Sequence, residues 1–280
     1  MEEVTALPGW LEKFRAGDDV FAHAWDSAGA EDRALLKTAI AWHFHRWGIS
    51  DASELCERRS PREGFCTRVS TQPVDWVLAI LSPGFSSPAR LLATLVPALI
   101  AGVAHPAVLS VGEPAGSVAA ALELAGIEDL FITDVRQAGR LAGELQDRRI
   151  AGRLILFPWT GNDSADDDVS ELFRSLGKKM RAYSDSPRPS LLITEQPSGI
   201  SHAELNARLL WLHPDARILD NRHEAQSPDA VYGVSPCSTG TPLSASMLFG
   251  SGMEACWTGP SPDFFRARRC AAFLTMEDEA

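Results

Sequence analysis

Short apolar runs alternate with helix-length segments through the middle of the chain, and this alternation limits the fold more than any other feature. The run at residues 75–81 (DWVLAIL) is apolar almost without a break, which is typical of a strand buried in a parallel sheet. A Ser-Pro-Gly turn follows it, then a helix-length segment at residues 88–101 and a second apolar run at residues 107–111. These pieces predict a strand–helix–strand unit with a right-handed crossover.

The same spacing recurs as far as residue 212. Further strands are predicted at residues 129–133, 153–157 and 190–194, and further helices at 116–125, 136–146, 169–180 and 203–212. This pattern predicts an α/β fold with a doubly wound, mostly parallel sheet and helices on both faces. Such sheets bind ligands beyond the carboxyl ends of their strands, so the loops at 82–86, 134–137 and 158–162 are the candidate ligand-binding segments.

The segments on either side do not follow this pattern. Residues 1–66 are predicted to form a helical N-terminal region, with one helix ending at Gly48. His43 and His45 are interpreted as cations near that helix end, because their i, i+2 spacing puts them on different faces. The doubly wound domain is assigned to residues 67–215. Residues 216–280 are predicted to contain a Ser-, Gly- and Pro-rich loop at 235–251 and a terminal helix at 262–274.

Charge and composition restrict the partners. The net charge is -11, and the densest basic group is only Arg266, Arg268 and Arg269, which argues against nucleic acid as a partner. The longest apolar stretch, residues 91–103, is too short to cross a bilayer, and the acidic start does not resemble a signal peptide. Five cysteines without a C-x-x-C pair indicate reduced thiols. We expect a cytoplasmic protein without a membrane partner, acting on a small molecule or dinucleotide.

The chain also contains eight tryptophans, several of them in the N-terminal region. Tryptophan is enriched at protein interfaces, so these side chains could form the seam of a homodimer. Ordinary core packing explains them equally well, and both interpretations stay open.

Several motifs follow one another in the order of a known family. They are LSPGFSSPARLLATLVPALIAGVAHPAVLS, ALELAGIEDLFITDVRQAGRLAGE and FPWTGN, followed by PSLLITE, LLWLHPDARIL and PSPDFFRARR. In this order they resemble histidinol dehydrogenase, a family of the aldehyde-dehydrogenase-like group, over roughly two thirds of the chain. The resemblance implies the fold of that group and the activity of an NAD-dependent oxidoreductase.

The resemblance also implies a cofactor site. Gln137 and Asn162 stand at the positions of a Gln and an Asn that help to hold the family's nicotinamide cofactor. Gly84, in the Pro-Gly turn, would let the backbone approach a ligand closely. Asn162 fits a plain turn after Gly161 equally well. The family's Tyr before the turn is Leu81 here, which removes one contact to the cofactor.

The family's zinc ligands are largely missing. His213 falls one residue away from the family's first His, Leu210 and Trp211 stand in place of its Gln, and residues 252–254 (GME) replace its last His. Zinc needs three or four well-placed ligands, so we expect no metal site and no bound zinc. We interpret His213 as a helix-end residue before Pro214.

No catalytic residue is assigned. His223 and Glu224 reverse the order of the family's acid/base pair, and Ser190 has no neighbouring base in the sequence. Cys237, in the Gly- and Ser-rich SPCSTG loop, is the strongest candidate for a nucleophilic thiol. We expect a divergent histidinol-dehydrogenase-like protein without zinc-dependent dehydrogenase activity that retains NAD binding. Two alternatives stay open, namely a non-catalytic scaffold on the same fold and a thiol-dependent aldehyde or acyl reductase.

Overall fold

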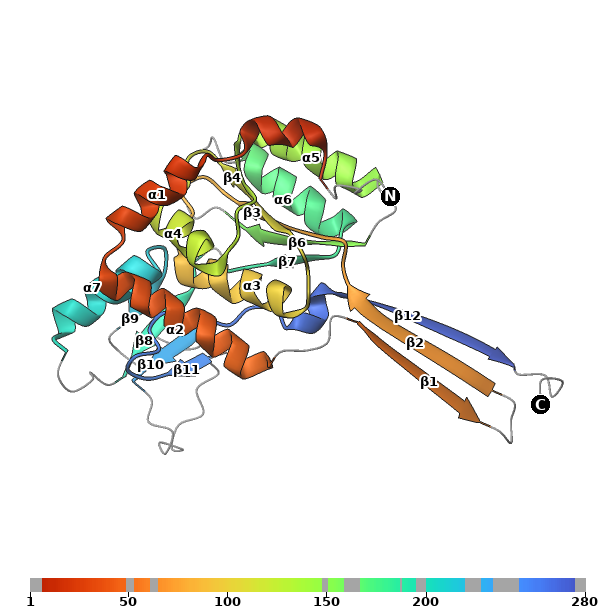
Figure 1. Cartoon of the computed structure of the whole chain (residues 1–280). Coiled ribbons are helices and arrows are strands. Elements are labelled where there is room, and N and C mark those ends of the chain that lie inside the picture. The colour runs from red at the N-terminus through yellow and green to blue at the C-terminus, as the bar shows by residue number, and fades with distance from the viewer. Residues whose placement is uncertain are drawn as a thin grey trace.

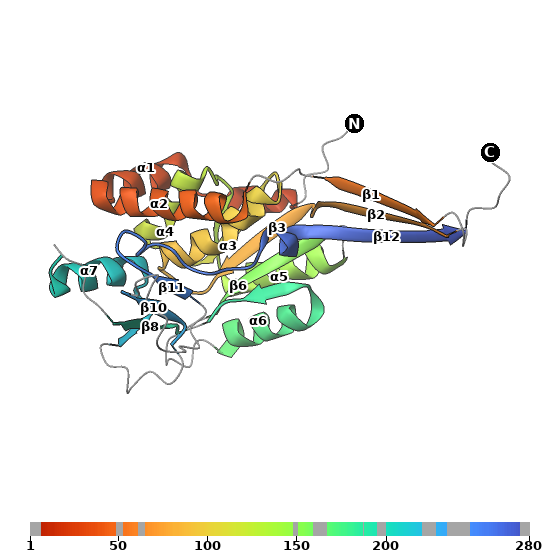
Figure 2. The ribbon, with the colours of Figure 1, turned by 90° about the horizontal axis from the view of Figure 1, so that it is seen from below.

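The structure is a computed structural model that describes residues 7–48, 53–60, 65–147, 151–158, 167–186, 188–194, 200–219, 228–233 and 247–274. Two parallel sheets and the helices around them form the body of the molecule, and a third, antiparallel sheet projects from it (Figures 1 and 2). No helix in these ranges is long and apolar enough to cross a membrane.

The first sheet has five parallel strands in the order β5-β4-β3-β6-β7. The strands are β3 (Trp76–Leu81), β4 (Pro106–Val111), β5 (Leu130–Thr133), β6 (Gly152–Phe157) and β7 (Ala182–Ser184). The central strand β3 is buried along its whole length, as its continuous apolar sequence predicts. The predicted α/β fold with parallel strands is therefore confirmed.

Helices cover both faces of this sheet because side chains alternate along each strand. Trp76, Leu78 and Ile80 pack with η1 (Gly9–Phe14), α5 (Val135–Asp147) and α6 (Asp167–Lys179). Val77, Ala79 and Leu81 pack on the other face with α3 (Pro88–Ile100) and α4 (Gly116–Ala125). The sheet is doubly wound, as predicted.

The second sheet has four parallel strands in the order β11-β10-β8-β9. They are β8 (Ser190–Ile193), β9 (Arg217–Leu219), β10 (Ala230–Tyr232) and β11 (Met247–Phe249), and α7 (His202–Leu212) packs on them. The alternation suggested that β8 continues the first sheet. Instead, β8 pairs with β9 and β10 and begins a new sheet.

Helix α3 is the element that joins the body together. Leu91 and Leu95 face the first sheet, Ala93 contacts the core of the second sheet, and Leu92 packs against α2 (Ala30–Trp47). A helix with apolar side chains on every side is expected to be buried on every side. The shorter α1 (Asp18–Ser27) lies against α4 in the same helical layer (Figure 1).

His43 at the end of α2 corrects one interpretation. Its ring is 1% exposed and lies 4.7 Å from the ring of Trp42. Burial lowers the pKa of His43 to about 4, so the side chain is neutral at physiological pH. It is therefore a core residue and not a cation that stabilises the helix end.

The projecting sheet corrects two further predictions. It consists of β1 (Glu54–Ser60), β2 (Phe65–Pro73) and β12 (Arg266–Leu274), all antiparallel. The predicted helical region therefore ends before residue 54. The predicted terminal helix reduces to the short η3 (Pro262–Phe265), and a strand follows it. Nine backbone pairs between β2 and β12 override the helical preference of the Ala- and Arg-rich segment.

Candidate functional site

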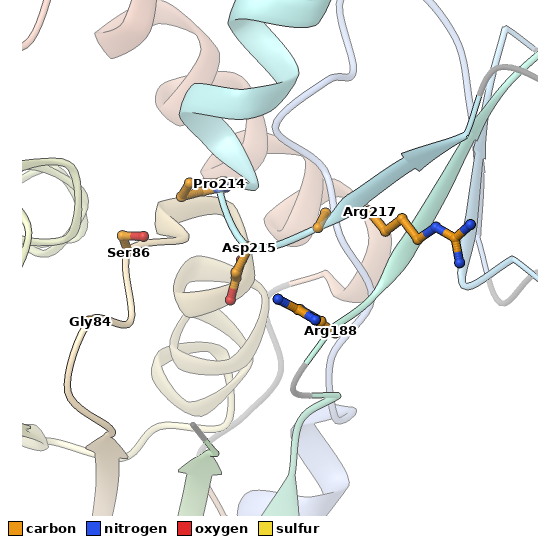
Figure 3. A pocket seen from close by; sticks show the side chains of 7 residues that line it. Gly84, Ser86, Arg188, Pro214, Asp215 and Arg217 are labelled. Atoms are coloured by element: carbon orange, nitrogen blue, oxygen red, sulfur yellow. The ribbon is translucent and has the colours of Figure 1, made fainter. Parts of the chain in front are cut away.

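A cavity of about 520 Å³ lies beyond the carboxyl end of β3, where the first sheet meets the second (Figure 3). Its walls come from the loop after β3, from the segment that enters β8, and from the segment that enters β9. The lining residues are Gly84, Ser86, Arg188, Pro214, Asp215, Ala216 and Arg217. Its volume lies within the range of about 300–1,000 Å³ that is usual for small-molecule sites.

The loop after β3 is fixed in place by hydrogen bonds at both of its ends. The backbone N–H of Phe85 donates to the carbonyl of Ser82 at 3.1 Å, and Gly84 has a φ of 76°, which favours glycine at this turn. The hydroxyl of Ser87 then caps α3 and donates to the carbonyl of Leu212 at 2.8 Å. This bond connects the β3 loop to the end of α7. The residues that follow α7 form the opposite wall of the cavity.

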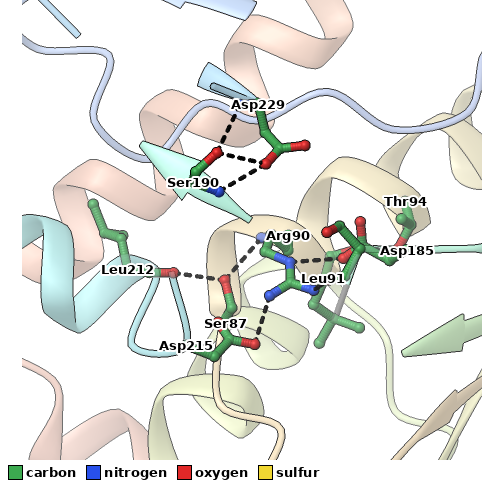
Figure 4. Close-up of polar contacts among 10 residues, drawn as sticks. Ser87, Arg90, Leu91, Thr94, Asp185, Ser190, Leu212, Asp215 and Asp229 are labelled. Carbon is green, nitrogen blue, oxygen red and sulfur yellow. Dashed lines mark hydrogen bonds and ion pairs between the residues drawn. The ribbon is translucent and has the colours of Figure 1, made fainter. Parts of the chain in front are cut away.

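Arg90 forms a buried ionic cluster beside the cavity (Figure 4). Its Nε donates to Asp185 Oδ2 at 2.7 Å, its Nη1 donates to Asp215 Oδ2 at 2.5 Å, and its Nη2 donates to the carbonyl of Ser186. Burial raises the pKa of Asp185, although the guanidinium opposes this rise. Oδ1 of Asp215 is buried and has no hydrogen-bond partner among the described residues. Asp215 thus connects the cluster to the cavity wall.

Arg188 directs an exposed guanidinium group toward Asp215 at the cavity, whereas the side chain of Arg217, which also lines it, extends away from the other lining side chains (Figure 3). Arg188 forms no hydrogen bond or ion pair with any residue in the described ranges. Guanidinium groups match phosphate and carboxylate oxygens geometrically and can bind them in a bidentate way. The cavity is therefore suited to an anionic ligand, although the chain as a whole is acidic.

Of the three predicted cofactor-binding residues, the structure places only one at the cavity. Gly84 lines the cavity. Gln137 does not line it and lies in the first turn of α5, where its backbone N–H donates to the carboxylate of Asp134 at 2.8 Å. The carboxylate of Asp134 therefore caps the N-terminus of α5 within the loop at 134–137 that was predicted to bind a ligand. The Oε1 atom of Gln137 is buried without a partner among the described residues. Asn162 lies outside the described residues, so its role remains a prediction.

Phe85, in the loop after β3, and Phe157, the last residue of β6, belong to the same buried core on the α3 face of the first sheet. The rings of Phe85 and Phe157 lie 4.4 Å apart, and both side chains are buried. The Arg90 guanidinium lies 5.5 Å from the centre of the Phe85 ring. The lining residues of the cavity accordingly come from the β3 loop and the second sheet, and none comes from β6.

His213 does not have the surroundings of a zinc ligand. It caps the end of α7, its Nε2 bonds to the carbonyl of Glu254 at 3.0 Å, and its ring packs against Trp257. Burial lowers the pKa of His213 to about 4. No group of three or more His, Cys, Asp or Glu side chains in the described ranges is arranged to hold a metal. The described residues do not fit zinc, and the absence of bound zinc remains a prediction for metal analysis.

Of the two nucleophile candidates in the sequence, the structure places Ser190 but not Cys237. The Ser190 hydroxyl donates to Asp229 Oδ2 at 3.0 Å and accepts from the backbone N–H of Asp229 at 3.2 Å (Figure 4). This reciprocal pair joins the starts of β8 and β10, which is a structural role. Cys237 lies outside the described residues. Cys256 is buried, and burial raises the pKa of its thiol to about 12, so it is not a ready nucleophile.

Sequence reasoning missed the charged residues of the cavity. Arg90 lies 95 and 125 residues from its two carboxylate partners, so no local motif connects them. Arg188 and Arg217 immediately precede or begin short strands in segments that look like ordinary turns. The one feature that could have identified them is their position at the start of strands of a second sheet. The sequence interpretation assumed a single sheet and therefore overlooked this position.

No protein-family model and no curated protein sequence matches this chain, whereas solved structures do. Histidinol dehydrogenase from Elizabethkingia anophelis aligns with 98% of this chain and 82% of its own, with a TM-score of 0.56 and 14% sequence identity. The chain has a dehydrogenase-like fold. Methylmalonate-semialdehyde dehydrogenase (DddC) from Oceanimonas doudoroffii agrees, with 94% and 83% of the two chains aligned, a TM-score of 0.51 and 9% identity. The fold implied by the sequence resemblance is thereby confirmed at the level of the aldehyde-dehydrogenase-like group.

Proposed function

We propose that this chain is a divergent dehydrogenase-like protein that uses no zinc and binds a nicotinamide dinucleotide in the cavity beyond β3. The observation that carries the proposal is that the exposed guanidinium group of Arg188 and the glycine turn at Gly84 both line a cavity of about 520 Å³. Parallel α/β sheets bind nucleotides beyond the carboxyl ends of their strands, and this cavity has that position.

The lining residues provide complementary contacts for such a ligand. Arg188 would bind the pyrophosphate oxygens, and Gly84, which has no side chain, leaves room for the ligand to approach the backbone. The N-terminus of α3, which begins next to Ser86, adds a favourable field for a negative charge.

The chemistry of this site would be limited to what these residues can do. A bound nicotinamide ring supplies hydride transfer. The lining side chains bind and orient the ligand, and Asp215 is the one carboxylate among them, already paired with Arg90. Gln137 and Asn162 belong to the proposal through the family resemblance alone.

Calorimetric titration with NAD and NADH tests the proposal, with metal analysis of the same preparation. The Arg188→Ala variant should bind the dinucleotide at least tenfold more weakly, because a charge-assisted hydrogen bond contributes about 1.5–3 kcal/mol. Arg174→Ala is the matched control, since Arg174 lies on α6 and is paired with Glu171 at the surface. This control should bind like the wild type.

Pyrophosphate is titrated in parallel to separate a dinucleotide site from a general anion site. Binding of pyrophosphate without binding of NAD or NADH would refute the nicotinamide assignment. No wild-type binding of the dinucleotide at millimolar concentration would have the same consequence, as would equal losses in the two arginine variants. One tightly bound zinc per chain would contradict the zinc-independent part.

A non-catalytic, partner-binding role is the second candidate. Two observations favour it, namely the packing of Phe85 against Phe157 in the core at the ends of β3 and β6, and the capping of α5 by Asp134. The aromatic packing leaves less room for a cofactor. The cap occupies a backbone N–H group of α5 that a cofactor phosphate would otherwise use. This role would account for a chain that binds neither dinucleotide nor pyrophosphate.

A further inference from the structure

The buried ionic cluster beside the cavity contains more negative than positive charge. Arg90 supplies its guanidinium, whereas Asp185 and Asp215 supply two carboxylates. The same guanidinium also donates to the carbonyl of Ser186, so three acceptors share it (Figure 4). The side chains of Arg90 and Asp185 are almost completely buried, and that of Asp215 is 12% exposed. A buried carboxylate without a full counter-charge is unfavourable, and uptake of one proton by the cluster would remove the surplus negative charge.

The neighbouring titratable groups do not supply the missing positive charge. In the described ranges, the charged side chains that act on Asp185 are Arg90 and Asp215. Burial raises the pKa of Tyr183 on β7 to about 12 and lowers the pKa of His213 at the end of α7 to about 4, so both side chains are neutral. Burial also raises the pKa of Asp185, and the carboxylate of Asp215 acts in the same direction. Asp185 is therefore the expected proton acceptor.

Asp215 connects this cluster to a ligand in the cavity. It lines the cavity, and its Oδ2 accepts from Nη1 of Arg90 at 2.5 Å. The guanidinium of Arg188 is directed toward Asp215 from the cavity side (Figure 3), and its charge offsets part of the surplus negative charge. An anion bound to Arg188 would cancel this effect and would add its own negative charge beside Asp215. Both changes favour protonation of the two acids.

We propose that the cavity binds an oxyanion together with a proton, and that the Asp185–Asp215 pair takes up this proton. The proton comes from solvent and adds to a carboxylate oxygen, and no other bond forms or breaks. The cluster then holds one guanidinium, one carboxylate and one neutral acid, and Arg188 pairs with the ligand. A ligand that binds with one proton binds more tightly as the pH falls, by at most about tenfold per pH unit.

The proposal rests on the anion-binding role of the cavity in the function proposed above, and it adds the regulation of that site by pH. Calorimetric titration of the full chain in two buffers of different ionisation enthalpy counts the protons taken up. The probes are NAD and sulfate, and the titrations run from about pH 5.5 to about pH 8, above the ordinary range of an exposed Asp. The wild type should take up a proton only toward pH 5.5. Its dissociation constants should be at least about threefold lower there than at pH 8.

The Asp185→Asn variant imitates the protonated cluster, because its amide oxygen can still accept from Arg90 while its charge is gone. At pH 8 it should bind both anions as tightly as the wild type does at pH 5.5, without proton uptake. A merely structural role for Asp185 predicts weaker binding instead. Asp215→Asn removes the other carboxylate, and it should give the same result if Asp185→Asn does not fold. Asp129→Asn is the matched control, since Asp129 pairs with Arg15 just before β5, at the opposite edge of the first sheet.

The possible results separate this inference from the proposed function. Binding of either anion without proton uptake, and with the same dissociation constant at both pH values, would overturn the inference and leave the proposed function intact. Binding of sulfate with proton uptake but no binding of NAD would support the inference and refute the nicotinamide assignment. No binding of either anion at tens of millimolar would overturn both. Uptake that persists in both Asp185→Asn and Asp215→Asn would place the proton elsewhere and contradict the proposal, as would its loss in Asp129→Asn.

Discussion

Nε of Arg90 lies 2.7 Å from Oδ2 of Asp185, and both side chains are almost completely buried. Arg90 belongs to α3, whereas Asp185 follows the last strand of the first sheet. The same guanidinium reaches Asp215, which precedes β9 of the second sheet and lines the cavity. One side chain therefore links the helix to both sheets, and the shape of the cavity depends on this link.

Removal of the Arg90 charge is expected to destabilise the fold strongly. Arg90→Met keeps much of the side-chain volume but leaves two buried carboxylates without their partner, which typically costs about 3–5 kcal/mol. Urea unfolding followed by circular dichroism measures the loss. The exposed pair Arg174–Glu171 supplies the control, because Arg174→Met should change the unfolding free energy by less than about 1 kcal/mol. Similar losses in the two variants would show that burial of the cluster is unimportant.

Local patterns predicted most of the body of the molecule. The runs DWVLAIL and RLILF became β3 and β6, and the helix predicted at residues 116–125 matches α4. The apolar residues of each of these elements lie close together in the sequence. Their pattern therefore identifies the strand or helix without knowledge of the tertiary structure. The projecting sheet has no such signal. Its strands are stabilised by pairing between β2 and β12, and Arg268 or Ala271 would favour a helix in isolation.

The same reasoning explains what was predictable at the candidate site. Gly84 follows a strand in a Pro-Gly turn, and the sequence indicated its place at a ligand-binding edge. Asp215 and Arg188 came to that edge only because the chain starts a second sheet, which depends on tertiary pairing. Their importance could not be read from neighbouring residues.

The stability of the protein is expected to fall in mild acid. Burial lowers the pKa of His43 and of His213 to about 4, below the value of about 6.5 for an unfolded chain. The unfolded state therefore binds more protons as the pH falls, so stability is complete above pH 6.5 and is lost progressively toward pH 4. Each residue contributes up to about 3 kcal/mol of this loss.

The His43→Phe variant isolates one of these contributions. Its unfolding free energy should decline less steeply between pH 6.5 and pH 4 than that of the wild type, as measured by urea titrations at several pH values. Asp185 has the opposite effect on the pH dependence of stability, because burial raises its pKa. Its contribution is the same in the wild type and the variant, so it does not affect the comparison. Parallel curves for the two proteins would contradict a buried, neutral His43.

Cys256 is expected to resist alkylation in the native state. Its thiol is fully buried, and burial next to Glu254 raises its pKa to about 12, so almost none of it is thiolate at pH 8. Iodoacetamide labelling mapped by mass spectrometry across a urea series should modify Cys256 only in step with global unfolding. Rapid labelling of Cys256 in the folded protein would contradict this burial and make Cys256 a candidate nucleophile for thiol-dependent chemistry.

Gly259 is expected to tolerate no side chain, because the C-terminal segment lies directly against α3 at this position. A Cβ built on Gly259 would lie 2.1 Å from the carbonyl oxygen of Ala93, which belongs to the backbone of a helix buried on all sides. Neither backbone segment can move aside as a flexible side chain would. Gly259→Ala should therefore lower the unfolding free energy by at least about 3 kcal/mol, the upper end for overpacking.

Gly143→Ala is the matched control, since nothing lies within 4 Å of its added Cβ on α5. That change should stabilise the protein by about 0.5–1 kcal/mol through helix propensity. Urea unfolding of both variants decides the matter, and a Gly259→Ala protein as stable as the wild type would mean that the C-terminal segment does not pack on α3 in this way.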